Sequence, residues 1–146
     1  MLENRSDMAS CKDDCEALMS ALLPVAERAL SEHRTLSPFG LTLSASEQIV
    51  QVGGFGLPSL DDATLIAQFR DSFRDGAARG ELKATALAYS AKGGVPGQAP
   101  LGEAVFVHLN HRDKYSIVVT FPYHFGDDGE LVIEEPFAND GSHDVF

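Results

Sequence analysis

The chain has 146 residues, of which 44% are hydrophobic and 23% charged, and 22 acidic against 11 basic side chains give a formal net charge of −11. This length suits one domain with one core, and the apolar content excludes a disordered chain because burial can offset the entropy of ordering. The negative charge repels a phosphate backbone, so we expect no nucleic-acid partner.

The N-terminal part of the chain predicts a short polar segment followed by a helix. Residues 1–9 lack a pattern, which predicts a disordered segment before a single domain over residues 10–146. Ser10 and the acidic residues after it are typical of a helix start, and we expect the helix to end near His33. Pro24 predicts a kink or a second helix beginning there. The apolar stripe of this helix includes Leu18, Leu22, Val25 and Ala29.

A hairpin and a second helix come next. Residues 36–54 alternate apolar and polar side chains around a polar turn, which predicts a β-hairpin. Residues 53–58 contain three glycines and a proline and predict a loop. Ser59 begins the second helix and Gly80 caps its end. The apolar face of this helix has residues at spacings of four, namely Leu65, Phe69 and Phe73.

The second half of the chain predicts β-structure. Its segment 92–102 is rich in Gly and Pro and is either a mobile hairpin tip or a functional flap. Strands are expected at residues 81–91, 103–111, 114–125 and 130–135. Alanines on one face of the first of these strands indicate that a helix packs closely there. The element order predicts an α+β fold, in which two main helices accompany an antiparallel sheet of five to six strands.

The triplet His-Arg-Asp at residues 111–113 also occurs in the catalytic loop of protein kinases. The glycine-rich loop, the ATP-contacting lysine and the Asp-Phe-Gly motif of kinases are absent from the sequence. We therefore interpret the triplet as the exposed tip of a hairpin whose last two residues form the turn. In that register His111 pairs with Lys114, and Asn110 pairs with Tyr115.

The same register suggests one candidate site. His108, Asn110 and Tyr115 would project from one face and gather at the end of an otherwise apolar surface. They are the candidate ligand-binding residues, as the wall of a small pocket. The alternative is a hydrogen-bonded set at the edge of the sheet, which buried polar groups require in any case.

The sequence predicts no metal site, no cofactor and no catalytic residue, and it leaves enzymatic activity open. Of the five histidines, His108 and His111 are three positions apart, a spacing that directs them to opposite faces of a strand. Cys11 and Cys15 would share a helix face, but no neighbouring ligand completes a metal set.

Location and membrane contact follow from composition. Two thiols four positions apart do not make a disulfide framework, which indicates a reducing, cytoplasmic location. No apolar run approaches the roughly 20 residues of a transmembrane helix, and the N-terminus lacks a secretory pattern. We therefore expect no membrane partner.

Several short motifs resemble a widespread family of small uncharacterised bacterial proteins, and the similarity covers the chain from about Leu22 onward. They are Pro38-Phe39-Gly40, LNHRDKY at residues 109–115, Phe121-Pro122-Tyr123, Glu135-Pro136-Phe137-Ala138 and Phe146. The resemblance implies bacterial origin and a stand-alone cytoplasmic domain, and it supplies no catalytic residues. The element order is also similar to profilin-like and roadblock-like domains, which favours a binding or dimerising module.

We therefore expect a cytoplasmic α+β domain that binds a protein partner or a second copy of itself. Residues 126–146 contain seven acidic side chains and no Lys or Arg, and this region could meet a basic partner. The apolar segments 121–123 and 136–137 are candidate contact surfaces. The alternative function is a small-ligand-binding or hydrolytic protein that uses the pocket predicted above.

Overall fold

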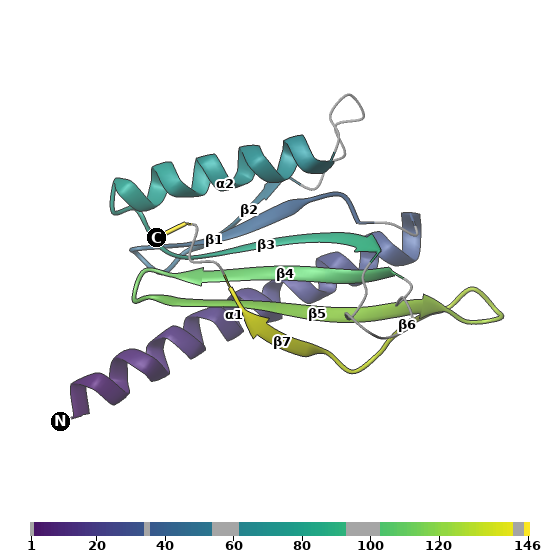
Figure 1. Cartoon of the computed structure of the whole chain (residues 1–146), viewed down its shortest axis with the longest axis horizontal. Coiled ribbons are helices and arrows are strands. Elements are labelled where there is room, and N and C mark those ends of the chain that lie inside the picture. Colours follow the sequence, from purple (N-terminus) through teal and green to yellow (C-terminus); the bar gives the residue numbers. More distant parts are fainter. Residues whose placement is uncertain (1, 34–35, 54–61, 93–102, 142–144) are drawn as a thin grey trace.

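The structure is a computed structural model that describes residues 2–33, 36–53, 62–92, 103–141 and 145–146. Its two helices and seven strands confirm the α+β class and the predicted order of elements (Figure 1). The helices are α1 (Leu2–His33) and α2 (Asp62–Ala78). The strands are β1 (Phe39–Ser44), β2 (Ile49–Gly53), β3 (Leu82–Lys92), β4 (Glu103–His111), β5 (Tyr115–Phe125), β6 (Leu131–Ile133) and β7 (Phe137–Asp140).

The strands form one antiparallel sheet in the order β2-β1-β3-β4-β5-β6. β7 also pairs with β5, so that β6 lies along the C-terminal end of β5 and β7 along its middle. β2 is therefore one edge of the sheet, and β6 and β7 share the other. The short strand β7 was not predicted, because its residues Asn139 and Asp140 disfavour strands and only pairing with β5 orders them.

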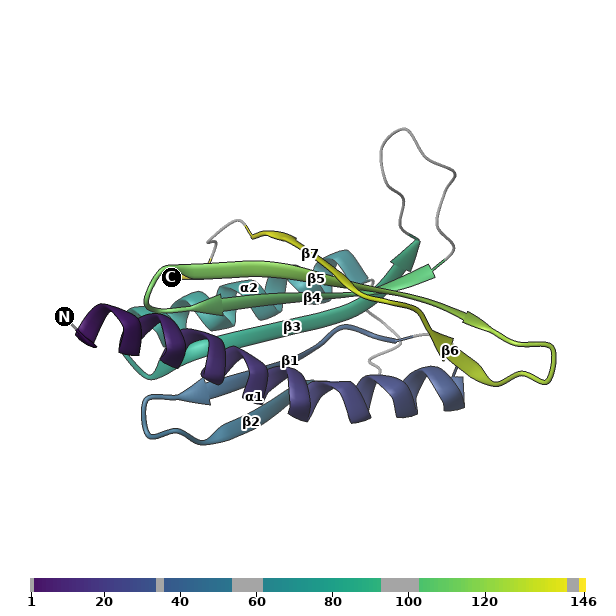
Figure 2. The same cartoon turned by 90° about the horizontal axis from the view of Figure 1, so that it is seen from below.

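Helix α1 covers one face of the sheet (Figure 2). Its residues in the main core recur every three or four positions, as predicted, and they are Cys15, Leu18, Leu22, Ala26 and Leu30. Val25 and Ala29 of the predicted stripe are only partly buried and pack against this core. They pack on three fully buried alanines of β3, which are Ala84, Ala86 and Ala88. The small side chains let the helix approach the sheet closely, which confirms the prediction from the alanine row.

The helix α1 departs from the sequence prediction at its N-terminus. It begins at Leu2, so residues 2–9, expected to be disordered, are helical. These residues include several good helix formers, and in Figure 1 this end of α1 extends beyond the sheet. Pro24 lies inside one continuous helix, so no second helix begins there, and the alternative, a kink at Pro24, stays a prediction. Burial of Leu22 and Ala26 on either side of the proline holds the helix together across it.

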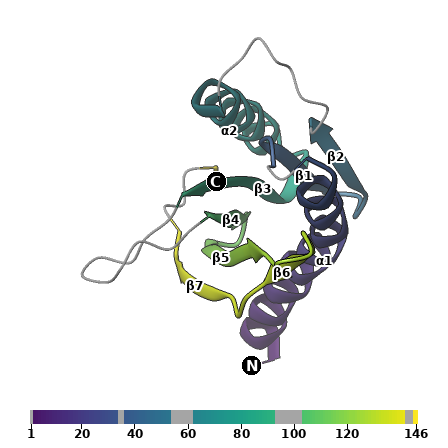
Figure 3. The ribbon, with the colours of Figure 1, turned by 90° about the vertical axis from the view of Figure 1, so that its right-hand side faces the viewer.

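Helix α2 lies on the opposite face of the sheet, as Figure 3 shows. Phe73 of α2 packs with Leu87 of β3 and with Val145 near the C-terminus. Gly80, the second residue after the end of α2, has a positive φ, which confirms the predicted glycine cap. No helix in the described ranges is long and apolar enough to cross a membrane. The predicted helix start at Ser59 and the segments 54–58 and 93–102 lie outside the described residues.

Gly40 of β1 lets Phe73 approach the sheet. A Cβ atom at Gly40 would lie 2.5 Å from Cζ of Phe73 and 3.3 Å from the carbonyl oxygen of Ala86. The first distance is far below ordinary contact, so any larger residue must displace the phenyl ring.

We expect Gly40→Ala to lower the free energy of unfolding by about 1–3 kcal/mol, because it overpacks the contact with Phe73. The measurement is the urea midpoint followed by circular dichroism. Gly126→Ala is the control, since its new Cβ would have its nearest neighbours at 3.4 Å and should change little. Equal midpoints for the two variants would contradict this account of Gly40.

Candidate functional site

The turn between β4 and β5 has three residues, 112–114, and His111 pairs with Tyr115. Lys114 has a positive φ, the left-handed conformation that closes a three-residue hairpin loop. The predicted two-residue turn, with His111 opposite Lys114, was therefore wrong by one residue. Sequence alone did not show this, because the left-handed residue here is a lysine and not a glycine.

The one-residue difference moves Tyr115 to the other face of the sheet. Tyr115 faces α1, whereas His108 pairs with Val118, and Asn110 with Ser116, on the α2 face. The structure thus brings His108 and Asn110 together and separates them from Tyr115. A ligand-binding role for each of the three stays a prediction.

His108 belongs to an aromatic row on the α2 face. Its ring stacks on Tyr89 with centroids 5.5 Å apart, and Tyr89 stacks in turn on Phe106 at 5.8 Å. The Tyr89 hydroxyl and His108 Nε2 are hydrogen-bonded at 2.9 Å. Burial raises the pKa of Tyr89, although the nearby Arg70 opposes that shift. The row is half-buried and could stack a flat ligand.

Asn110 is 5% exposed, and its Oδ1 atom has no hydrogen-bond partner among the described residues. It lies within the sheet between Thr85 and Ser116. A buried carbonyl oxygen without a partner costs roughly 1–3 kcal/mol, so this atom favours a site for water or a polar ligand.

Tyr115 lines a different feature, an open groove of about 270 Å³ between α1 and β5. Burial raises the pKa of Tyr115, and Cys15, Cys11 and Glu16 add to that rise. The groove is mostly apolar and includes Cys15, Glu16, Met19, Tyr115, Ile117 and Val119.

A buried polar cluster, not predicted from the sequence, lies where α1 crosses the β4–β5 turn. His111 and Cys11 are each 1% exposed, and Cys11 Sγ lies 3.4 Å from His111 Nδ1. His111 Nε2 lies 2.8 Å from Asp14 Oδ2. The expectation that His111 is exposed was wrong, because His111 pairs with Ala84 on the face that α1 covers, where Cys11 and Asp14 contact its ring. Only Arg112 and Asp113 of the triplet are exposed.

The contacts of His111 indicate its tautomer. The backbone N–H of Asp113 donates to Nδ1 at 3.1 Å, so Nδ1 carries a lone pair and the Nε2–H donates to Asp14. Cysteine, histidine and aspartate in this order resemble an activated nucleophile with its base and orienting carboxylate. The burial of Cys11 and His111, however, keeps a substrate away from the sulfur in this conformation.

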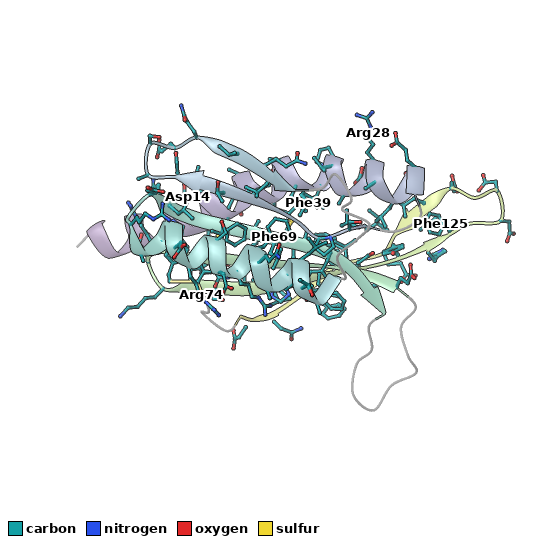
Figure 4. All side chains as sticks on the ribbon, turned by 90° about the horizontal axis from the view of Figure 1, so that it is seen from above. Asp14, Arg28, Phe39, Phe69, Arg74 and Phe125 are labelled. Carbon is teal, nitrogen blue, oxygen red and sulfur yellow. The ribbon has the colours of Figure 1, made fainter. Side chains whose placement is uncertain are left out.

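Ion pairs extend the cluster to the first hairpin. Lys83 Nζ of β3 lies 3.9 Å from Asp14 Oδ2 and 3.0 Å from Glu47 Oε1 in the β1–β2 turn. Figure 4 shows Asp14 at this end of the sheet. The cluster therefore links α1, β3 and two turns at one end of the fold.

The two edges of the sheet differ in charge. Large exposed apolar side chains occur on both, with Ile49 and Val50 in β2 and Phe137 in β7. β2 contains no charged residue, whereas β7 lies among the acidic side chains of Glu134, Glu135 and Asp140. Of the apolar segments expected at a contact surface, residues 121–123 are buried, whereas Pro136 and Phe137 are exposed.

Searches of protein-family models, of curated proteins and of solved structures found no match to this chain. The resemblance to small bacterial proteins stays a prediction.

Two buried groups predict a loss of stability at high pH. Burial raises the pKa of Cys15 from 9.0 to about 12, with Cys11 and Asp14 adding to the rise. Burial and the hydrogen bond to Glu103 raise the pKa of Tyr123 from 10.0 to about 12. The folded state holds these protons where the unfolded chain releases them, so the free energy of unfolding falls as pH rises from about 9 to about 12.

Urea titrations between pH 8 and 11.5 measure this loss. We expect Cys15→Ala to flatten the fall from about pH 9 upward, and Tyr123→Phe to flatten it only above about pH 10, following the unfolded-state pKa values. If the stability of both variants falls with pH as steeply as that of the wild type, then Cys15 and Tyr123 are not the cause of the loss.

Proposed function

We propose that this chain is a cytoplasmic protein-binding module that self-associates through the edge strand β2. The observation that carries the proposal is an uncharged edge strand with two exposed apolar side chains. Ile49 is 41% exposed and Val50 is 51% exposed. The two cysteines of the chain, Cys11 and Cys15, lie four positions apart and do not make a disulfide framework, which supports a reducing, cytoplasmic setting.

An edge strand offers backbone N–H and C=O groups to another strand. Within the described residues β2 pairs with β1 alone, so no second described strand lies along its outer side. Two β2 strands can pair antiparallel across a twofold axis, which would join two sheets into one. The apolar side chains beside the new ladder would then lose contact with water.

Charge favours a second copy at β2 over one at the opposite edge. A chain with formal net charge −11 repels its own copies wherever acidic side chains meet. The edge formed by β6 and β7 carries Glu134, Glu135 and Asp140, whereas the segment Ile49–Gly53 carries no charge. Self-pairing at β2 therefore brings fewer acidic groups of the paired strands together than self-pairing at the β6–β7 edge.

We expect the wild-type protein to be a dimer in size-exclusion chromatography with light scattering, and Val50→Lys to be a monomer. A lysine on an edge strand opposes pairing, and Val50 is exposed enough for the fold to tolerate it. Phe137→Lys is the matched control on the other edge and should remain dimeric. Added salt should strengthen the wild-type dimer, since it screens the repulsion between copies.

A wild-type protein that stays monomeric at every concentration and salt level would overturn the proposal. So would a dimer that Val50→Lys leaves intact. Circular dichroism of both variants separates a lost interface from a lost fold.

A second candidate function, small-ligand binding, is favoured by the buried Asn110 Oδ1 beside the row of His108 and Tyr89. A thermal-shift screen of small polar aromatic compounds tests it. We expect compounds that stabilise the wild type to lose their effect in His108→Ala and Asn110→Ala. The same compounds should still stabilise Tyr115→Phe, because Tyr115 lies on the opposite face of the sheet from His108 and Asn110. Absence of any stabilising compound, or equal shifts in all variants, would count against this function.

A further inference from the structure

We propose that Cys11, His111 and Asp113 form a binding site for a zinc-type divalent cation. Their ligand atoms make a nearly equilateral triangle: Sγ to Nδ1 is 3.4 Å, Sγ to Oδ2 is 3.9 Å, and Nδ1 to Oδ2 is 3.7 Å. The bond lengths of tetrahedral zinc predict edges of roughly 3.3–3.6 Å between such ligands. One ion could therefore contact all three after shifts of a few tenths of an ångström.

The tautomer and orientation of the His111 imidazole already suit metal binding. Its Nε2–H donates to Asp14, and its Nδ1 lone pair points toward Cys11 and Asp113. A carboxylate that orients a metal-binding histidine through the other ring nitrogen is a recurring feature of zinc sites. The ion would replace the N–H of Asp113 at Nδ1, and this amide belongs to an exposed turn, where water can accept its hydrogen bond.

The ion pair between Asp14 and His111 does not account for the whole cluster. It satisfies Nε2 and explains the burial of the ring, but it requires neither a thiol nor a second carboxylate at Nδ1. A cation at the centre of the triangle explains why both groups converge there. It would also neutralise the carboxylate and thiolate charges brought close together.

The chemistry of the ligands indicates which cation fits. A thiolate with an imidazole favours zinc and similar transition metals over magnesium and calcium, which prefer oxygen ligands. The Asp113 side chain is 46% exposed, whereas Cys11 and His111 are each 1% exposed. The ion would thus enter from the turn and keep one position open to water on that side.

Binding would link distant parts of the chain, because Cys11 belongs to α1 and the other two ligands lie at the end of β4 and in the turn after it. A ligand that binds only the folded state stabilises it. We therefore expect zinc to raise the melting temperature. The site involves none of the residues of β2, so its test is separate from that of the dimer.

Titration of the reduced, metal-free protein with Co²⁺ tests the site, because a cobalt–thiolate bond gives a strong near-ultraviolet absorption band. We expect the band to saturate at one ion per chain and to disappear when Zn²⁺ is added. Cys11→Ser should abolish the band, and Cys15→Ser, one helical turn away and outside the triangle, should keep it. Asp14→Asn should weaken zinc binding about 10–100-fold.

Asp113→Ala tests the site without disturbing the core, since Asp113 is exposed. We expect this variant to retain the wild-type circular dichroism and melting temperature without metal, and to lose the rise in melting temperature on adding zinc. A wild-type protein with no cobalt–thiolate band would overturn the proposal. A band that persists in Cys11→Ser, or a zinc-induced shift unchanged in Asp113→Ala, would do the same.

Discussion

The backbone of Lys114 decides the arrangement of the second half of the fold. Its left-handed conformation closes a three-residue turn and sets the register of β4 against β5. Because side chains alternate along a strand, that register determines which residues of β5 face α1. Ile117 and Val119 then join the core under α1, and His111 is buried at the end of the same face. Turn geometry and hydrophobic burial therefore favour the same pairing.

Pairing between strands leaves the two edges of the sheet as its main open backbone. Helix α1 packs on the alanine row of β3, and α2 packs on the other face where Gly40 makes room for Phe73. The edges then differ chiefly in charge, since β2 is neutral and the β6–β7 edge is acidic. A strongly acidic chain can pair with itself most easily at the neutral edge. The strand order and the distribution of charge therefore both favour β2 as the surface for self-association.

The polar cluster at the end of the sheet has two compatible roles. As it stands, the chain of contacts from Glu47 through Lys83 and Asp14 to His111 ties α1 to two turns. The thiol of Cys11 and the carboxylate of Asp113 add a set of ligands on the other side of the imidazole. The carboxylate of Asp14 serves both roles, because it holds the tautomer that leaves the Nδ1 lone pair available to a cation.

The sequence by itself determined the elements, since helical spacing, strand alternation and the Gly80 cap depend on residues a few positions apart. It predicted the α+β class, the first hairpin and most strand boundaries for this reason. Tertiary structure alone decided the length of the β4–β5 turn, the strand β7 and the burial of His111. It also brought together Cys11 and His111, which are 100 positions apart in the chain. No local pattern encodes such contacts, because they arise only when the helix and the sheet bury their apolar faces against each other.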